Sequence, residues 1–209
     1  MRLTPGQIKS DPGFVYLDEL QYDDIVEFTS KYLKKRTPSM RFFYLSLLGM
    51  AILVIGALIF GMISHNRTFG SIMKQYLYGL IISFSVIIPI HEIIHGLVYV
   101  LLGARKIRFG AEFRQFAFYA VADEFVTTKI GFYILACSPF LIITLLNLAG
   151  FIFVPCVASY TYIAIIFFHA TMCIGDFALM SYYDTHRDKN IYSFDDVKKK
   201  ISYFYYKKK

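Results

Sequence analysis

The stretch "IIPIHEIIHGLVYVLLG", residues Ile87 to Gly103, decides how the rest of the sequence is interpreted. Fourteen of its 17 residues are apolar or glycine, as in a helix that crosses a membrane or lies in a core. Near its centre stand His91, Glu92 and His95. Because polar and charged side chains are costly in such surroundings, their presence predicts a functional site.

The composition of the whole chain predicts a membrane protein. The 209 residues are 56% hydrophobic, and the mean hydropathy is +0.50. A soluble protein with four buried helices is disfavoured, because a chain of this length has too little polar surface to cover them. The apolar residues gather into four blocks, each long enough for a helix to cross a bilayer. We therefore predict an all-α polytopic membrane protein with spans at Phe43–Ile63, Tyr76–Leu102, Ile130–Val154 and Tyr160–Ser181.

The positions of Lys and Arg predict how the spans are oriented. Seven precede the first span, two lie between spans one and two, five between spans two and three, none between spans three and four, and eight follow the fourth. Basic residues concentrate on the cytoplasmic side. We therefore expect a cytoplasmic N-terminal segment (1–42), a four-span domain (43–181) and a basic cytoplasmic tail (182–209). Anionic lipid headgroups suffice to explain the net charge of +7, so no nucleic-acid partner is expected.

His91, Glu92 and His95 form the pattern HExxH. On a helix, residues i and i+4 share a face, so both imidazoles can bind one metal ion. Zn²⁺ lowers the pKa of a bound water to about 7, and Glu92 can take the proton of that water as the catalytic base. The alternative is a pair of core histidines with a salt-bridged glutamate. It lacks a cation, because no Lys or Arg falls in a predicted span.

A catalytic zinc generally takes a third protein ligand. Asp176 in "CIGDFAL" is the best candidate by depth, since at 1.5 Å per residue His95 lies ~10 Å and Asp176 ~8 Å from the cytoplasmic ends of their spans. His169, two turns before Asp176, is either a substitute ligand or a group that supports a ligand. Glu112 and Glu124 are glutamates downstream of the motif, but they lie in the cytoplasmic loop.

Several other residues in the spans carry predictions. Pro89 removes a backbone donor and predicts a kink that frees a carbonyl near Phe84–Ser85. Asn147 is expected to donate to a neighbouring helix or to a developing oxyanion. Gly175 predicts a close approach of helices beside Asp176. The three cysteines show no spacing typical of a zinc or redox pair and are predicted to be buried free thiols: Cys137, Cys156 and Cys173.

Outside the spans, the sequence predicts a turn at Asp11–Gly13 and a short amphipathic helix within Tyr22–Arg36. The loop Ala104–Lys129 alternates between apolar and polar residues around Gly110. It predicts a short β-hairpin with its turn near that glycine, or else a simple amphipathic connection. The tail begins with a capping-box pattern at Ser193 and predicts a basic interfacial helix, with a frayed charged tail as the alternative.

The motifs HEIIHG, SPF in span three and CIGD in span four, in this order, resemble the small bacterial membrane proteins described as "putative zincin peptidases". The resemblance covers roughly Gly79 to Tyr183. The arrangement is similar, more distantly, to the site-2 proteases. That similarity implies intramembrane zinc bound by His91, His95 and Asp176, with Glu92 as the general base and peptide cleavage near the cytosolic face. The chain departs from the site-2 pattern before the aspartate, where Ile-Gly replaces Asn-Pro or Leu.

These observations predict a Zn²⁺-dependent intramembrane peptidase of the cell membrane whose substrate is a membrane protein or peptide. One alternative is a non-proteolytic membrane protein in which the same cluster binds metal structurally or transports it. Another is a scaffold with an inert HExxH. Glu92 and Asp176 are the only acids in the predicted spans, which disfavours transport.

Overall fold

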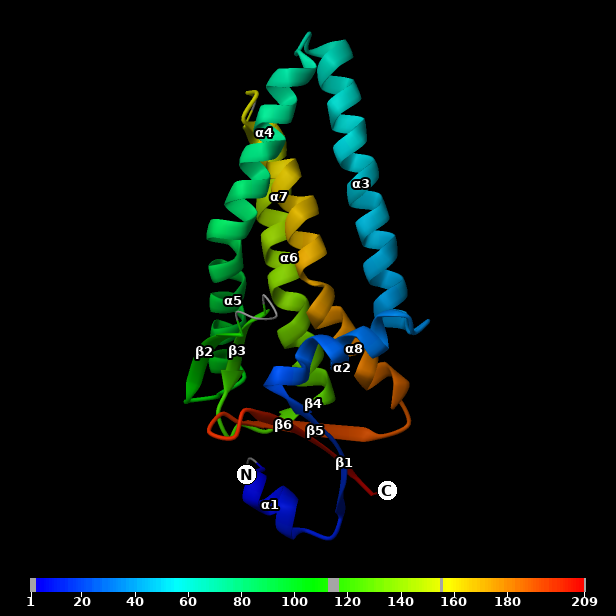
Figure 1. Ribbon diagram of the computed structural model, residues 1–209, viewed down its shortest axis with the longest axis vertical. Helices are drawn as coiled ribbons and strands as arrows, with labels where there is room; N and C mark the ends of the chain where they lie inside the picture. Colours follow the sequence, from blue (N-terminus) through cyan, green and yellow to red (C-terminus); the bar gives the residue numbers. More distant parts are fainter. Residues whose placement is uncertain (1–2, 113–116, 155, 209) are drawn as a thin grey trace. The chain divides into compact units, whose positions relative to one another are not determined.

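The computed structural model describes residues 3–112, 117–154 and 156–208. Figure 1 shows a set of long helices and a region of short strands. The α-helices are α1 (Pro5–Ser10), α2 (Ile25–Leu33), α3 (Pro38–Ser64), α4 (Phe69–Ile82), α5 (Ile88–Leu101), α6 (Lys129–Phe153), α7 (Ser159–Met172) and α8 (Ile174–Thr185). A 3₁₀ turn, Tyr22–Asp24, leads into α2, and a π turn, Ser83–Ile87, joins α4 to α5. The strands are β1 (Phe14–Gln21), β2 (Ile107–Glu112), β3 (Ala117–Ala122), β4 (Thr127–Thr128), β5 (Asn190–Asp196) and β6 (Ile201–Lys207).

The chain divides into two compact units. The sheet unit comprises the residues up to Met40, Glu92–Ser138 and the residues from Gly175 onward. The helical unit comprises Arg41–His91 and Pro139–Ile174.

Among the described residues, three helical runs are long and apolar enough to cross a membrane: α3, the run Phe69–Leu101 and α6. They coincide with the first three predicted spans and are long and apolar enough for them, although the second begins seven residues earlier than expected. The fourth predicted span is two helices, α7 and α8, bent at a break at Cys173. The pair counts as a fourth span only if both helices are taken together.

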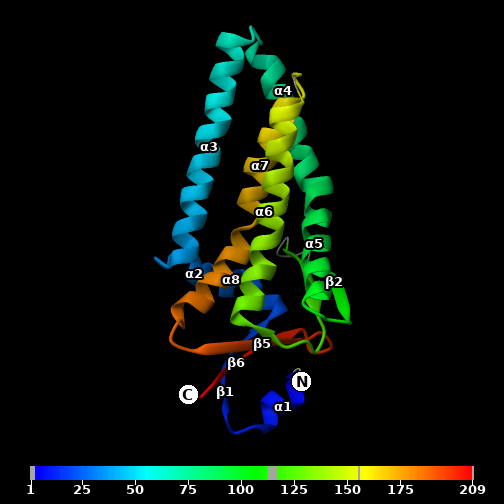
Figure 2. The same ribbon diagram turned by 180° about the vertical axis from the view of Figure 1, so that it is seen from behind.

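In the helical unit, α4 and α7 pack side by side, as both Figure 1 and Figure 2 show. Gly79 makes this possible, because a Cβ atom there would lie 2.4 Å from the Cβ of Ala164 and 2.9 Å from the carbonyl oxygen of Thr161. Small residues allow membrane helices to approach closely in this way. The Thr161 hydroxyl also donates to Gln75 Oε1 at 2.8 Å, so a polar contact fixes the register of the pair.

A π turn, Ser83–Ile87, lies where the sequence predicts a kink before Pro89. In this turn the N–H of Ile88 bonds to the carbonyl of Ser83, five residues back. The Ser83 and Ser85 hydroxyls donate to the carbonyls of Gly79 and Ile81, each at 2.7 Å. The helix continues through this turn into α5, in which Pro89 is the second residue.

The sheet unit contains two antiparallel sheets, which correct the all-α prediction. The larger sheet has the strand order β1-β6-β5-β4, and the smaller one consists of β2 and β3. One face of the larger sheet packs on α1 through the buried cluster Ile8, Phe14, Val126 and Phe194. The other face packs on α2 and α8 through the buried cluster Leu20, Phe28, Tyr182, Tyr183, Ile191 and Phe204.

The predicted C-terminal helix is wrong, because this segment forms the hairpin β5–β6. Val197–Lys200 form its turn, in which the N–H of Lys199 bonds to Asp196 Oδ1 and Lys200 has a φ of 55°. Ser193, the expected helix cap, instead accepts a hydrogen bond from the Tyr183 hydroxyl at 2.7 Å. The run of aromatic residues in β6 favours an extended strand between two neighbours, and pairing with β1 and β5 overrides the helical spacing.

The N-terminal predictions are confirmed in part. The Asp11 side chain accepts from the N–H of Gly13 at 2.8 Å, which forms the predicted turn. The predicted amphipathic helix is α2, whose Ile25, Phe28 and Tyr32 pack in the core of the sheet unit. Strand β1 between the turn and the helix was not predicted.

The central loop contains the predicted hairpin, formed by β2 and β3. Its turn does not fall at Gly110, which lies inside β2 opposite Tyr119. The residues that join the strands, 113–116, lie outside the described residues, and Arg114 among them. A Cβ atom at Gly110 would lie 2.5 Å from the Tyr119 ring, so this glycine makes room for an aromatic side chain across the strands.

The contact between α4 and α7 gives a first testable prediction. Gly79→Ala should lower the free energy of unfolding by about 1–3 kcal/mol, because the added methyl meets backbone atoms of α7 as well as a side chain. Gly56→Ala in α3 is the matched control, since a Cβ there meets no atom within 4 Å. Thermal unfolding in detergent compares them. Equal stability of the two variants would contradict the close packing.

Asp195 in β5 gives a second prediction. Loss of hydration raises its pKa to about 6, although the Ser202 and Tyr22 hydroxyls donate to its carboxylate. A raised pKa in the folded state means that stability is present below about pH 4 and is lost as the pH rises through about 6. Asp195→Asn keeps the acceptor oxygen and should stabilise the protein at pH 8 by about 1–2 kcal/mol, allowing for partial exposure, but not at pH 4.

Thermal unfolding of wild type and variant across this pH range measures the effect. The exposed Asp188→Asn serves as the control. A difference between Asp195→Asn and wild type that does not grow with pH would refute the assignment.

Candidate metal centre

Helix α5 carries both histidines of the HExxH pattern, one turn apart. His91 and His95 are 8% and 7% exposed, so both imidazoles are shielded from solvent. His91 closes the part of α5 that belongs to the helical unit, and Glu92 and His95 belong to the sheet unit.

In the sheet unit, His95 Nδ1 lies 3.1 Å from the carbonyl oxygen of Leu135 in α6. A carbonyl oxygen can only accept, so Nδ1 carries the proton and the neutral ring keeps its lone pair on Nε2. This carbonyl lies four residues before Pro139, which stands inside α6 and has no N–H to offer it. The SPF motif thus has a physical role, since its proline leaves a backbone acceptor for His95.

His95 Nε2 lies 3.3 Å from Asp176 Oδ1 of α8. The two residues matched by depth therefore lie next to each other. In the neutral tautomer set by Leu135, a lone pair faces a carboxylate, so the pair is stable only with a cation between them or a second proton on the ring. A charge-assisted N–H···O bond is about 2.7–2.9 Å long, whereas two N/O ligands of a tetrahedral zinc are about 3.4 Å apart. The observed distance is near the second value.

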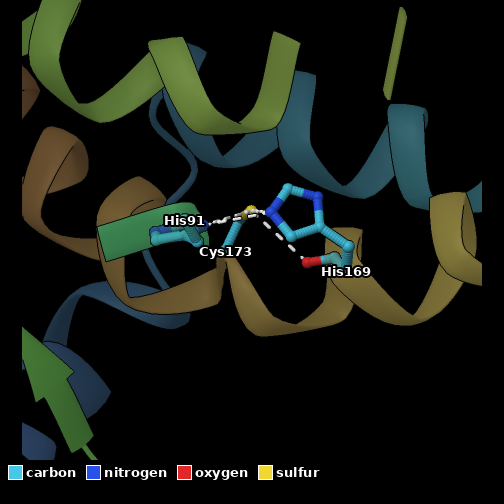
Figure 3. Close-up of side chains that lie close together, drawn as sticks. All are labelled: His91, His169 and Cys173. Atoms are coloured by element: carbon cyan, nitrogen blue, oxygen red, sulfur yellow. Dashed lines mark hydrogen bonds between the residues drawn. The ribbon is translucent and has the colours of Figure 1, made fainter. Parts of the chain in front are cut away.

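In the helical unit, His91 faces two residues at the end of α7. Its Nδ1 lies 3.0 Å from His169 Nε2, and the sulfur of Cys173 lies 3.5 Å from His169 Nε2 and 3.9 Å from His91 Nδ1. Figure 3 shows the two rings and the sulfur converging. His169 and Cys173 are fully buried and four residues apart, so the last turn of α7 presents both on one face.

Glu92 follows His91 directly and is partly buried, with its Oε2 atom shielded from solvent. One turn after Glu92, Gly96 lets strand β2 approach α5. A Cβ atom at Gly96 would lie 2.7 Å from the ring of Phe109 in β2. The hairpin β2–β3 is therefore held against the same helix turn that carries His95.

Asn147 and Gly175 have different surroundings from those expected, and the two loop glutamates are paired with lysines. Glu112 and Glu124 form ion pairs with Lys200 and Lys106, at 3.5 and 3.0 Å, which disfavours both as metal ligands. The Asn147 amide donates to the carbonyl of Ile143 in its own helix at 2.8 Å, not to a neighbouring helix. Gly175 does not mediate a close contact, because a Cβ atom there would meet nothing within 4 Å.

The three cysteines are free thiols, as predicted, but they differ in burial. Cys173 is buried, Cys137 is half-buried and Cys156 is exposed, so the prediction of burial is wrong for Cys156. The proximity of Cys173 to His91 and His169 was not predicted. A search for cysteine pairs could not find it, whereas the spacing His169-x₃-Cys173 on an apolar helix was the available signal.

Comparison with known proteins supports one class. Residues 84–183 match the family model described as "Putative zincin peptidase", which confirms the resemblance predicted from HEIIHG, SPF and CIGD. No curated protein and no solved structure matches the chain. The match includes both histidines of HExxH and Asp176. The family description points to a metallopeptidase.

The role of Pro139 is testable without a metal. Pro139→Ala supplies an N–H that competes for the Leu135 carbonyl, so His95 should lose its fixed tautomer and populate both ring forms. Nitrogen NMR of labelled histidine in the metal-free protein measures the tautomer. Leu141→Ala, an exposed position of the same helix, should leave the signal unchanged. An unaltered His95 signal in Pro139→Ala would show that the proline does not control this hydrogen bond.

Proposed function

We propose that the chain is a zinc-dependent intramembrane peptidase that hydrolyses peptide bonds of membrane-embedded substrates near the cytosolic face. The observation that carries the proposal is the pairing of His95 Nε2 with Asp176 Oδ1 while Nδ1 is held by Leu135. This arrangement presents two metal-binding atoms at ligand spacing. The family match supports the metallopeptidase class, and the long apolar helices are compatible with a membrane location.

In this proposal the ligands are His91, His95 and Asp176. Imidazole nitrogen and carboxylate oxygen are the donors that catalytic zinc generally takes, and three protein ligands leave a further position for water or substrate. Each histidine has its Nδ1 within 3.1 Å of a polar atom, so each can offer Nε2. Such contacts to the second ring nitrogen fix the orientation of a metal-binding imidazole. The donors present therefore suit zinc.

When bound there, Zn²⁺ supplies a Lewis acid that polarises the scissile carbonyl and makes water acidic. The Glu92 carboxylate takes the proton from the attacking water and passes it to the nitrogen of the leaving amine. A partly buried carboxylate next to His91 is suitable for this shuttle, since it is near the ligands without having to bind the metal itself.

The substrate is expected to lie extended along strand β2. In the described part of the chain, β2 pairs with β3 alone, so one of its edges offers backbone donors and acceptors. Peptides add to such edges as an extra strand. Because Gly96 and Phe109 hold β2 against α5, a peptide on this edge runs close to the helix turn of His95. The distribution of Lys and Arg supports a cytoplasmic position for this hairpin.

Glu92→Gln tests the mechanism. Wild type and variant are reconstituted in liposomes with a panel of single-span model peptides, and cleavage is followed by mass spectrometry. The variant should retain zinc and lose about 10²–10⁴-fold in rate, because the amide cannot accept the proton. Glu124→Gln, an exposed glutamate of the loop, is the matched control and should cleave as wild type does.

Undiminished cleavage by the Glu92→Gln variant would rule out this role. The alternative, a structural or transport metal site without proteolysis, predicts zinc binding in both variants and no cleavage by any of the three proteins.

A further inference from the structure

A second set of metal-binding atoms lies wholly within the helical unit. His91 Nδ1 and His169 Nε2 are 3.0 Å apart, and Cys173 Sγ is 3.5 and 3.9 Å from them (Figure 3). With zinc bonds of about 2.0–2.1 Å to nitrogen and 2.3 Å to sulfur, a tetrahedral site has edges of about 3.3 Å between nitrogens and 3.6 Å between nitrogen and sulfur. The three observed distances agree with these edges to within a few tenths of an ångström.

The chemistry and burial of this group are also those of a metal site. Two imidazoles and one thiol are the donor types of His/Cys zinc sites, and the sulfur favours thiophilic ions over Mg²⁺ or Ca²⁺. All three residues are buried, His169 and Cys173 completely. The Cys173 thiol donates to the carbonyl oxygen of His169 at 3.3 Å, which holds the sulfur on the side of the imidazoles.

We propose that His91, His169 and Cys173 form a second metal position, one that binds a thiophilic d¹⁰ ion such as Zn²⁺ through Nδ1 of His91. Nothing in the peptidase mechanism uses His169 or Cys173 as a ligand. His169 of α7, Cys173 directly after α7 and His91 of α5 supply the three protein ligands of this position.

The two positions exclude each other. A neutral imidazole has one nitrogen with a lone pair and one with a proton. When His91 binds an ion through Nδ1, the proton moves to Nε2, and the peptidase position loses this ligand. An ion bound by Cys173 therefore leaves the HExxH centre without His91 as a ligand. The ion in the second position does not itself catalyse hydrolysis. The competition between the two positions for His91 rests on the proposed function, whereas metal binding by His91, His169 and Cys173 does not.

Cobalt in the Asp176→Asn chain tests the second position by itself. The purified full-length variant is stripped with a chelator in detergent and titrated with Co²⁺, and absorption in the near ultraviolet is recorded. The substitution removes a ligand of the proposed peptidase centre and leaves all three residues of the cluster intact. We expect about one Co²⁺ per chain with sulfur-to-cobalt charge-transfer absorption.

Cysteine variants in the Asp176→Asn background identify the sulfur. Adding Cys173→Ser should abolish the charge-transfer absorption and weaken cobalt binding about tenfold or more. The matched control replaces the other two cysteines, Cys137→Ser and Cys156→Ser, and should keep both. Serine can donate to the His169 carbonyl as the thiol does, and thermal unfolding verifies that the variant is folded. If it is not, His169→Gln replaces it with the same expected loss of binding.

Two results would overturn the second position. One is the absence of charge-transfer absorption in Asp176→Asn, whether or not cobalt binds. The other is absorption that survives the loss of Cys173. Neither result bears on peptide cleavage, which the Glu92→Gln comparison measures separately, so the second position and the proposed function can fail independently.

Discussion

The hydrogen bond between His95 Nδ1 and the carbonyl oxygen of Leu135 is the constraint on which the proposed metal centre depends. It exists because Pro139 has no N–H to occupy that carbonyl in the helix. It fixes the protonated nitrogen of His95 and thereby places a lone pair opposite the Asp176 carboxylate. Pro139 removes one backbone hydrogen bond from α6, and the carbonyl left over determines which tautomer His95 adopts.

Helix breaks position the other polar groups in a similar way. The π turn Ser83–Ile87 lies directly before the part of the helix that carries His91, and π turns are frequent at functional sites. The break at Cys173 ends α7 one turn after His169 and brings a sulfur beside two imidazoles. The close packing of α4 on α7 at Gly79 stabilises the helical unit that contains this cluster. Each break costs regular backbone pairing, and each lies within a few residues of a candidate ligand.

The sequence predicted the contact between His95 and Asp176 better than the fold around it. The spacing of HExxH fixes His91 and His95 on one helix, and counting residues from the span ends was sufficient to pair His95 with Asp176. The prediction of a helix in the C-terminal tail was wrong, because the spacing of four apolar residues also fits a helical period: Phe194, Val197, Ile201 and Phe204. A turn at Val197–Lys200 and pairing with β1 nevertheless make strands of the same residues.

Two contacts could not be predicted from sequence at all. The partner of the Leu135 carbonyl depends on how α5 lies against α6 in the sheet unit, and a proline alone does not identify it. The proximity of Cys173 and His169 to His91 depends likewise on the packing of α7, although the i, i+4 spacing of the first two was visible. In both cases a local rule identified which groups are available, and the tertiary structure decided which partner they meet.

X-ray absorption at the zinc edge of the wild-type protein tests the central claim most directly. The account predicts bound zinc with nitrogen and oxygen ligands at about 2.0–2.2 Å, including two imidazoles, and loss of this signal in Asp176→Asn. Wild-type protein that binds no zinc, or zinc whose ligands include a sulfur at about 2.3 Å, would contradict the assignment of His91, His95 and Asp176 as the principal metal centre.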